Sequence, residues 1–185
     1  MTKIFFDPGH GGKDPVAVEN GLREKDLTLD NSKLIELILM NGYQCVTVKL
    51  SRTGDQTLYL KQRTDMANSW RANYFLSLHI NAGGGLGFES FSYNGSYNGK
   101  AETNRNQNII HDEIIKATGL KDRGKKEANY HMVRESCMQA CLTESGFIDN
   151  AADARLLKQS AFLDKVDRGH QNGLAKALGL KKGYS

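Results

Sequence analysis

Hydrophobic positions along this chain follow two alternating periods, which predict strands and helices in turn. Short runs of aliphatic and aromatic residues are typical of strands, whereas apolar residues spaced three and four apart are typical of amphipathic helices. We expect strands at residues 3–6, 43–50, 74–80, 88–93, 130–134 and 140–143. Helices are expected at residues 24–40, with Gly42 as a left-handed stop, and at 58–71, 101–118 and 159–178. The charged stretch from Lys121 to Asn129 is expected to be a loop.

Strands that alternate with helices of this length predict an α/β fold. We expect a three-layer sandwich, in which a twisted, mainly parallel (mixed) sheet of about six strands is flanked by helices. Residues 74–80 are almost entirely apolar, which indicates a central strand covered on both faces. The 185 residues suit one domain, which we place at residues 1–178, and residues 179–185 are expected to form a tail or the start of a linker.

Composition narrows the range of functions only slightly. The net charge of +4 favours anionic partners, such as a cell-wall polymer or nucleic acid. No apolar run approaches the ~20 residues that cross a bilayer, and a strand begins at Lys3, so we expect neither membrane insertion nor a signal peptide. Cys45, Cys137 and Cys141 lack the Cys-x2-Cys spacing of zinc sites, and we expect all three to be buried free thiols.

Four ionisable residues follow predicted strands or begin a predicted helix. His10 lies after the first strand in Asp7-Pro8-Gly9-His10-Gly11-Gly12, where glycines allow a sharp turn. His79 ends the third strand, Glu24 begins the first helix, and Glu144 follows the last strand. Because the carboxyl ends of parallel strands meet at one edge of a sheet, we expect these side chains to converge. Two histidines and one glutamate form a catalytic zinc set, and the second glutamate remains for proton transfer.

Each of these residues also has a simpler interpretation. A histidine at a strand end is more often a hydrogen-bonded polar residue, and Glu24 can interact favourably with the helix dipole alone. Glu144 can form a buried ion pair with Arg123 or Arg134. Gly83–Gly87 lacks the Lys-Ser/Thr of a phosphate loop, so we expect a flexible loop beside the site. The presence of all four residues at one edge favours the metal site.

Several segments occur in an order that resembles a known family. They are Asp7–Gly12, Glu24–Asp26, Ser51–Thr53, Arg63–Asn68, Ser77–Ala82, Asp122–Gly124 and Glu144–Asn150. This order is similar to that of the zinc-dependent N-acetylmuramoyl-L-alanine amidases of the amidase 3 type, over nearly the whole chain. Asp149 stands where that family usually has serine, and Gln139 where it often has proline. Neither departure falls on an expected ligand, so we expect them to affect local loop shape only.

The resemblance implies a hydrolase that cleaves the amide between the lactyl group of N-acetylmuramic acid and L-alanine in bacterial peptidoglycan. It implies that His10, Glu24 and His79 bind one zinc ion per chain. Glu144 is then the catalytic carboxylate, which acts as general base and then general acid on zinc-activated water. Two alternatives remain open: a zinc carboxypeptidase or endopeptidase that acts on the stem peptide, and a non-catalytic binder of anionic wall polymers or nucleic acid.

The resemblance also implies a partner and a place of action. We expect peptidoglycan as the partner, no nucleic acid, and a monomeric chain. Without a signal peptide, we expect bacteriolytic action on the wall after release or lysis, by a phage endolysin or a mother-cell lytic enzyme, rather than by an ordinary secreted autolysin. Residues 179–185 are then the start of a linker to a wall-binding module that these residues do not include.

Overall fold

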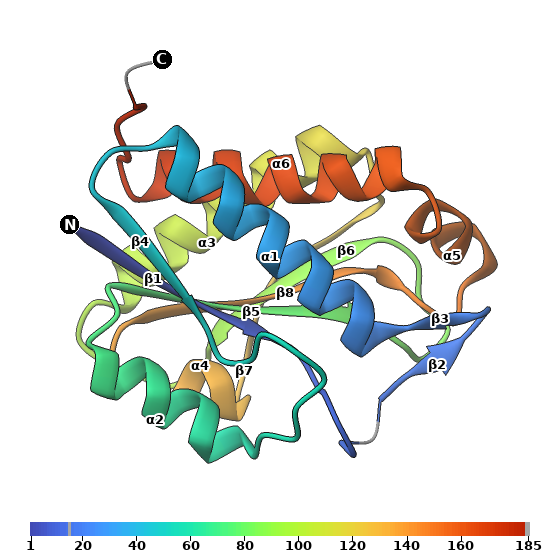
Figure 1. Cartoon of the computed structure of the whole chain (residues 1–185), viewed down its shortest axis with the longest axis horizontal. Coiled ribbons are helices and arrows are strands. Elements are labelled where there is room, and N and C mark those ends of the chain that lie inside the picture. Colours follow the sequence, from blue (N-terminus) through green and yellow to red (C-terminus); the bar gives the residue numbers. More distant parts are fainter. Residues whose placement is uncertain (15, 184–185) are drawn as a thin grey trace.

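The computed structural model describes residues 1–14 and 16–183, which form a three-layer α/β sandwich (Figure 1). The central sheet has six strands in the order β4-β1-β5-β8-β6-β7. Their bounds are β1 (Thr2–Pro8), β4 (Val46–Leu50), β5 (Tyr74–Asn81), β6 (Phe88–Tyr93), β7 (Asp122–Ala128) and β8 (Gln139–Phe147). The predicted fold class is therefore confirmed.

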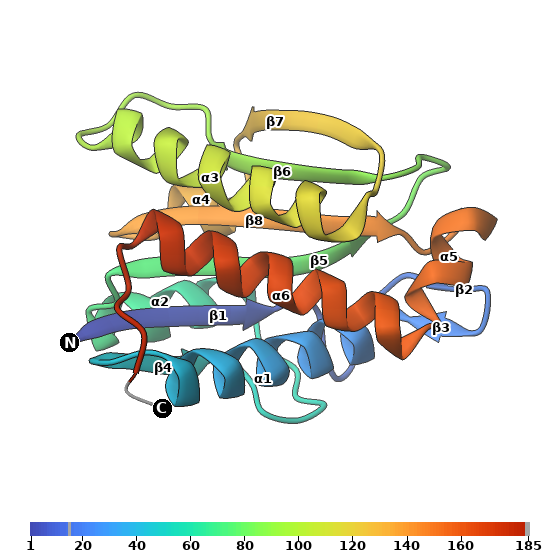
Figure 2. The same ribbon diagram turned by 90° about the horizontal axis from the view of Figure 1, so that it is seen from above.

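Helices cover both faces of this sheet, as Figure 2 shows. The long helices α1 (Glu24–Gly42), α3 (Lys100–Thr118) and α6 (Ser160–Ala177) lie on one face. The shorter α2 (Leu60–Trp70) and α4 (His131–Arg134) lie on the other. A short hairpin of β2 (Val18–Glu19) and β3 (Leu22–Arg23), together with α5 (Ala151–Leu157), lies beyond the arrowheads of β1, β5 and β8.

The directions of the strands decide which residues share an edge of the sheet. Strands β4, β1, β5 and β8 are mutually parallel, whereas β6 is antiparallel to β8, and β7 is parallel to β6. The sheet is therefore mixed, as expected. Its carboxyl edge, at the ends of β1, β5 and β8, also carries the beginnings of β6 and β7.

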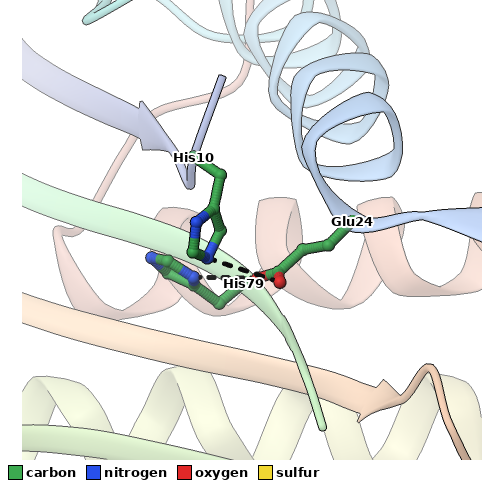
Figure 3. Close-up of side chains that lie close together, drawn as sticks. All are labelled: His10, Glu24 and His79. Carbon is green, nitrogen blue, oxygen red and sulfur yellow. Dashed lines mark hydrogen bonds and ion pairs between the residues drawn. The ribbon is translucent and has the colours of Figure 1, made fainter. Parts of the chain in front are cut away.

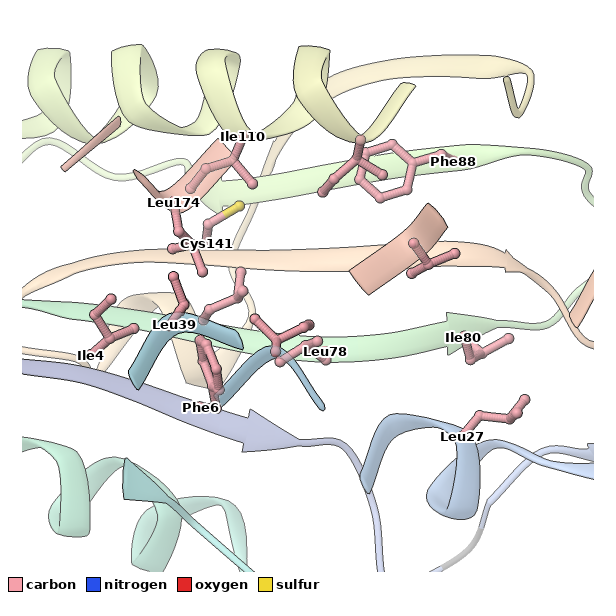
Figure 4. Close-up of a cluster of buried hydrophobic side chains, with 14 of the residues drawn as sticks. Ile4, Phe6, Leu27, Leu39, Leu78, Ile80, Phe88, Ile110, Cys141 and Leu174 are labelled. Carbon is pink, nitrogen blue, oxygen red and sulfur yellow. The ribbon is translucent and has the colours of Figure 1, made fainter. Parts of the chain in front are cut away.

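Two hydrophobic clusters fill the space between the layers. Successive strand residues point to opposite faces, so Phe6 packs in the larger cluster beneath α1, α3 and α6, whereas Phe5 packs in the smaller cluster beneath α2 and α4. Figure 4 shows the larger cluster, in which Ile4 and Phe6 of β1 meet Leu39 of α1 and Leu174 of α6. The side chains of residues 74–78 are buried, which confirms the predicted central strand.

The charged stretch between residues 121 and 129 forms β7, so the predicted loop is wrong. This strand lies at the edge of the sheet and is half exposed, which allows it to consist largely of charged residues. The predicted strand at residues 130–134 is also wrong, because this segment forms the single turn of α4. The sheet thus has the expected number of strands, but one of them was assigned to the wrong segment.

The connection between α1 and β4 also differs from the prediction. Gly42 is still helical, and α1 ends where Tyr43 adopts an extended backbone, so the predicted left-handed stop is wrong. Cys45 has a left-handed φ of 54° and lies before the strand rather than in it. Cys45 and Cys137 are exposed, and only Cys141 is buried, so the expectation of three buried thiols is wrong for two of them.

The predicted tail contacts the domain for as far as the structure describes it. The backbone nitrogen of Gln44 donates to the carbonyl oxygen of Lys181 at 2.8 Å, and Lys182 forms a β-bridge with Tyr43. Residues 184 and 185 lie outside the described residues. Among the helices that are described, none is long and apolar enough to cross a membrane.

Candidate active site

The structure brings His10, Glu24 and His79 together at the carboxyl edge of the sheet (Figure 3). His10 lies two residues after β1, with a left-handed φ of 60°, and His79 lies in β5. Glu24 is the first residue of α1, and its carboxylate contacts both imidazole rings, which lie edge-on to each other. Three elements that are distant in the sequence therefore each supply one side chain.

The spacing of these side chains fits a metal ion. Glu24 Oε1 lies 2.9 Å from His79 Nδ1, and Glu24 Oε2 lies 3.4 Å from His10 Nε2. One donor atom from each residue lies within 4.8 Å of the other two. Ligands that are 2.0–2.1 Å from a tetrahedral zinc ion are about 3.3 Å apart, so small shifts satisfy that geometry. His10 Nδ1 lies 3.1 Å from Asp14 Oδ2, a carboxylate of the kind that orients metal-binding histidines.

The charges in this cluster are strongly coupled. Burial by itself raises the pKa of Glu24, but the hydrogen bonds with His10 and His79 outweigh it and lower that pKa to about 2. Burial lowers the pKa of His79, but its hydrogen bond with Glu24 and the nearby carboxylates raise it to about 9. The cluster therefore holds a charged carboxylate beside the imidazole of His79, which can exchange its proton for a cation.

Glycine at position 9 is required by the close approach of the turn to His79. A Cβ atom at Gly9 would lie 2.4 Å from His79 Cε1 and 2.6 Å from its Nδ1. Any side chain there would displace the imidazole ring. The glycine of the Asp7–Gly12 segment thus lets the backbone that carries His10 lie directly against the second histidine.

Two buried arginines hold the turn that carries His10. Arg63 Nη1 donates to the carbonyl oxygen of Pro8 at 2.8 Å, and its Nη2 donates to that of His10 at 2.6 Å. Arg52 Nη2 donates to the carbonyl oxygen of Gly9 at 2.9 Å. Both arginines belong to segments of the family pattern, but their role could not be predicted, because their acceptors are backbone carbonyl groups, which every residue type carries.

Arg63 also neutralises a buried carboxylate. Its Nη1 lies 2.9 Å from Asp7 Oδ1, and both side chains are almost completely buried. The hydroxyl groups of Ser51 and Ser77 donate to the same carboxylate at 2.7 and 2.9 Å. This network connects β1, α2 and β5 directly beneath the histidines.

Replacing Arg63 with methionine is expected to lower the free energy of unfolding by about 3–5 kcal/mol, because Asp7 is then a buried charge without its cation. Equilibrium denaturation at pH 7 measures this change. Arg105, which is 59% exposed in its side chain, provides a matched control, since Arg105→Met is expected to stay within about 0.5 kcal/mol of the parent. A loss below 1 kcal/mol in Arg63→Met would contradict this role.

Glu144 lies beside the cluster of His10, Glu24 and His79 but does not join it. In the sheet it is paired with His79 of β5 on one side and with Glu89 of β6 on the other. Its Oε2 is buried and has no hydrogen-bond partner among the described residues. Burial raises the pKa of Glu144 to about 7, because the charges of Glu24 and Glu89 add to the effect of burial, although the nearby histidines oppose it. Glu144 is therefore suited to exchange protons near neutral pH.

The alternative partners considered for Glu144 are engaged elsewhere. Arg123 Nε donates to Glu89 Oε2 at 2.8 Å, and Arg134 Nε donates to Glu135 Oε1 at 2.6 Å. The interpretation of Glu144 as an ion-pair partner of Arg123 or Arg134 is therefore wrong. Glu89, which sequence analysis did not identify, is the residue that binds Arg123.

The glycine run beside the site is tied to the last loop of the domain. The backbone nitrogens of Gly83 and Gly84 both donate to Asp149 Oδ2, each at 2.7 Å. Asp149 is the position that departs from the family pattern, and its side chain does bear on loop shape. His131 lies 3.3 Å from the hydroxyl oxygen of Thr64, in α2, and is not part of the cluster of His10, Glu24 and His79.

Comparisons with known proteins agree with this geometry. A family model described as N-acetylmuramoyl-L-alanine amidase matches residues 4–176. The chain is 55% identical to the N-acetylmuramoyl-L-alanine amidase CwlM of Bacillus licheniformis and 53% identical to the sporulation-specific N-acetylmuramoyl-L-alanine amidase of Bacillus subtilis. These alignments cover 98% of this chain and 71% and 70% of the relatives.

A phage protein and a solved structure are also similar. The endolysin of Bacillus phage SPP1 is 44% identical, over 98% of this chain and 68% of the endolysin. The structure of the catalytic domain of CwlV, an N-acetylmuramoyl-L-alanine amidase from Bacillus (Paenibacillus) polymyxa, superimposes with a TM-score of 0.89 at 34% identity. That superposition covers 98% of this chain and the whole of the other.

Proposed function

This chain belongs to the N-acetylmuramoyl-L-alanine amidase family, and we propose that it binds one zinc ion through His10, Glu24 and His79. With this ion it hydrolyses the amide between N-acetylmuramic acid and L-alanine in peptidoglycan. The observation that carries the zinc assignment is the approach of three donor atoms to within 4.8 Å of one another. A His2Glu set leaves the fourth position of a tetrahedral site open, as catalytic zinc sites require.

Glu144 is the proposed general base and general acid. A zinc ion bound at the cluster would act as a Lewis acid on the scissile carbonyl and on water. Glu144 accepts the proton of the attacking water and then donates it to the nitrogen of L-alanine as the amide bond breaks. Its raised pKa supports this role, because a carboxyl group with a pKa near 7 both gains and loses a proton readily at neutral pH.

The other residues position this machinery. Arg52 and Arg63 hold the turn that carries His10, and Asp14 orients its imidazole ring. Asp14 is separated from the proposed zinc ion by His10, and its hydrogen bond to Nδ1 leaves Nε2 for the metal. These contacts support a site that is formed before substrate binds.

Product analysis separates the amidase from a zinc peptidase. Digestion of purified sacculi is expected to release peptides with a free L-alanine amino group and glycans with a free lactyl carboxyl group, both identified by mass spectrometry. Shortened stem peptides that remain attached to muramic acid would instead identify a carboxypeptidase or endopeptidase. Binding without turnover, weakened by salt, would indicate a non-catalytic wall binder.

We also propose a domain boundary and a place of action. We place the catalytic domain at residues 1–178 and regard residues 179–185 as a tail or linker. The chain is proposed to act as a monomer on the wall, without a nucleic acid partner. Its similarity to a sporulation-specific bacterial amidase and to a phage endolysin supports action on the wall by a mother-cell or phage lytic enzyme.

A further inference from the structure

A row of charged side chains continues across the sheet beyond the proposed catalytic carboxylate. Glu144 in β8 is paired with Glu89 in β6, and β7 is the next strand. The register between β6 and β7 shifts between Phe88 and Ser90, so that Arg123 and Gly124 together lie opposite Glu89. Gly124 has a φ of 95°, a left-handed conformation that favours glycine. The bulge places Arg123 beside the carboxyl edge, next in line after Glu89.

Glu89 holds this part of the site by three contacts. It is 5% exposed, and its Oε2 accepts from Arg123 Nε at 2.8 Å and from Lys126 Nζ at 2.5 Å. Its Oε1 accepts from Asn81 Nδ2, two residues beyond His79, at 2.8 Å. The three contacts use most of the acceptor sites of this buried carboxylate, and its charge is already paired with two cations, so Glu89 serves to hold Arg123.

Arg123 is held in place but keeps its binding groups available. Its guanidinium carbon lies 4.7 Å from the centre of the Phe147 ring, and the Nε contact with Glu89 fixes the other side. Neither Nη1 nor Nη2 of Arg123 forms a hydrogen bond with any residue that the structure describes. The side chain is 29% exposed. A fixed guanidinium group with two free NH2 groups matches the geometry of a carboxylate.

We propose that Arg123 binds a carboxylate of the stem peptide, on the residue that follows L-alanine. This inference rests on the proposed function, and it adds a specificity residue to that function. Strand β7 is two strand spacings, or about 10 Å, from the β8 strand that carries Glu144. Arg123 reaches back from β7 to Glu89 in β6, so its guanidinium group lies about one strand spacing, or about 5 Å, from β8. A peptide advances at most about 3.3–3.6 Å per residue, so a carboxylate on the residue that follows L-alanine can reach this group.

Lysine cannot replace this arginine equally well. An ammonium group is a single point charge, whereas the guanidinium group binds both carboxylate oxygens while Nε stays on Glu89. Lys126 also contacts Glu89, through its terminal nitrogen, so its charged group is already used there. Because the guanidinium group of Arg123 is positively charged and only donates hydrogen bonds, the enzyme is expected to prefer a substrate with a carboxylate over one with a carboxamide at this position of the stem peptide.

Two soluble muropeptides test this inference. Both carry N-acetylmuramic acid, L-alanine and a γ-linked D-glutamyl residue, and they differ only in a free α-carboxylate or an α-carboxamide. The parent enzyme is expected to cleave the carboxylate with a kcat/KM about 10- to 100-fold higher, as expected for a hydrogen bond between charged groups. Arg123→Gln is expected to reduce this ratio to near one, and Arg123→Lys to an intermediate value.

The ratio is measured within each variant, so a partial loss of folded protein cancels. Arg105→Gln removes the same charge from an exposed position on α3, and this variant is expected to keep the parental ratio. Equal cleavage of both muropeptides by the parent, or an unchanged ratio in both Arg123 variants, would overturn the inference but leave the amidase function intact. Release of products other than a free lactyl group and L-alanine amine would overturn the proposed function itself.

Discussion

Replacing Glu144 with glutamine is expected to reduce the rate of peptidoglycan hydrolysis by about 10²–10⁴-fold while zinc stays bound. Glutamine keeps the shape of the side chain but cannot accept the proton of the attacking water. Glu144 is placed to accept this proton, since it lies beside His79 in the sheet and its buried Oε2 has no partner in the described part of the chain. Release of new amino groups from sacculi measures the rate, and metal analysis measures zinc.

The control for this prediction is a glutamate that is far from the site. Glu102 is 58% exposed in its side chain and lies at the start of α3, so Glu102→Gln is expected to retain the parental rate. If Glu144→Gln hydrolyses the wall at close to the parental rate, the proton-transfer role is wrong even where the zinc site is right. Loss of zinc in Glu144→Gln would instead identify Glu144 as a ligand.

Replacing His79 with alanine is expected to remove zinc and activity together. The variant loses one of three ligands and also leaves Glu24 with only His10 as its imidazole partner. Metal analysis of the purified variant is expected to show little zinc, and hydrolysis is expected to fall to the limit of detection. His131→Ala is a matched control, because His131 contacts Thr64 outside the cluster. Full zinc occupancy in His79→Ala would refute the assignment.

The same site predicts how zinc affinity depends on pH. The pKa of His79 is raised to about 9, so at pH 7 its imidazole carries a proton that the metal must displace. Zinc affinity is therefore expected to rise as pH increases towards about 9, by up to tenfold per pH unit for this one proton. Competition with a chelator at several pH values measures the slope. A slope of zero below pH 9 would contradict the protonated state of the free site.

The class of fold and the location of the site could be predicted from local patterns. Apolar residues with strand and helix periods alternate along the chain, and this pattern predicts a three-layer α/β sandwich. His10, His79 and Glu144 each follow or end a predicted strand, and parallel strands present their carboxyl ends at one edge. These features depend on neighbours in the sequence, so the sequence by itself determined them.

Tertiary structure alone decided the partners within the site. From the residues alone either glutamate could join the histidines, and it is the packing of α1 against β5 that brings Glu24 into contact with both imidazole rings. Because β6 lies between β8 and β7 in the sheet, Arg123 of β7 forms its ion pair with Glu89 of β6 and not with Glu144 of β8. The edge strand β7 has too many charged residues to show an apolar period. The partners of Arg52 and Arg63 are backbone carbonyl groups, which cannot be identified from residue types. Each of these contacts joins segments that are distant in the chain, and local periodicity holds no information about which distant segments meet.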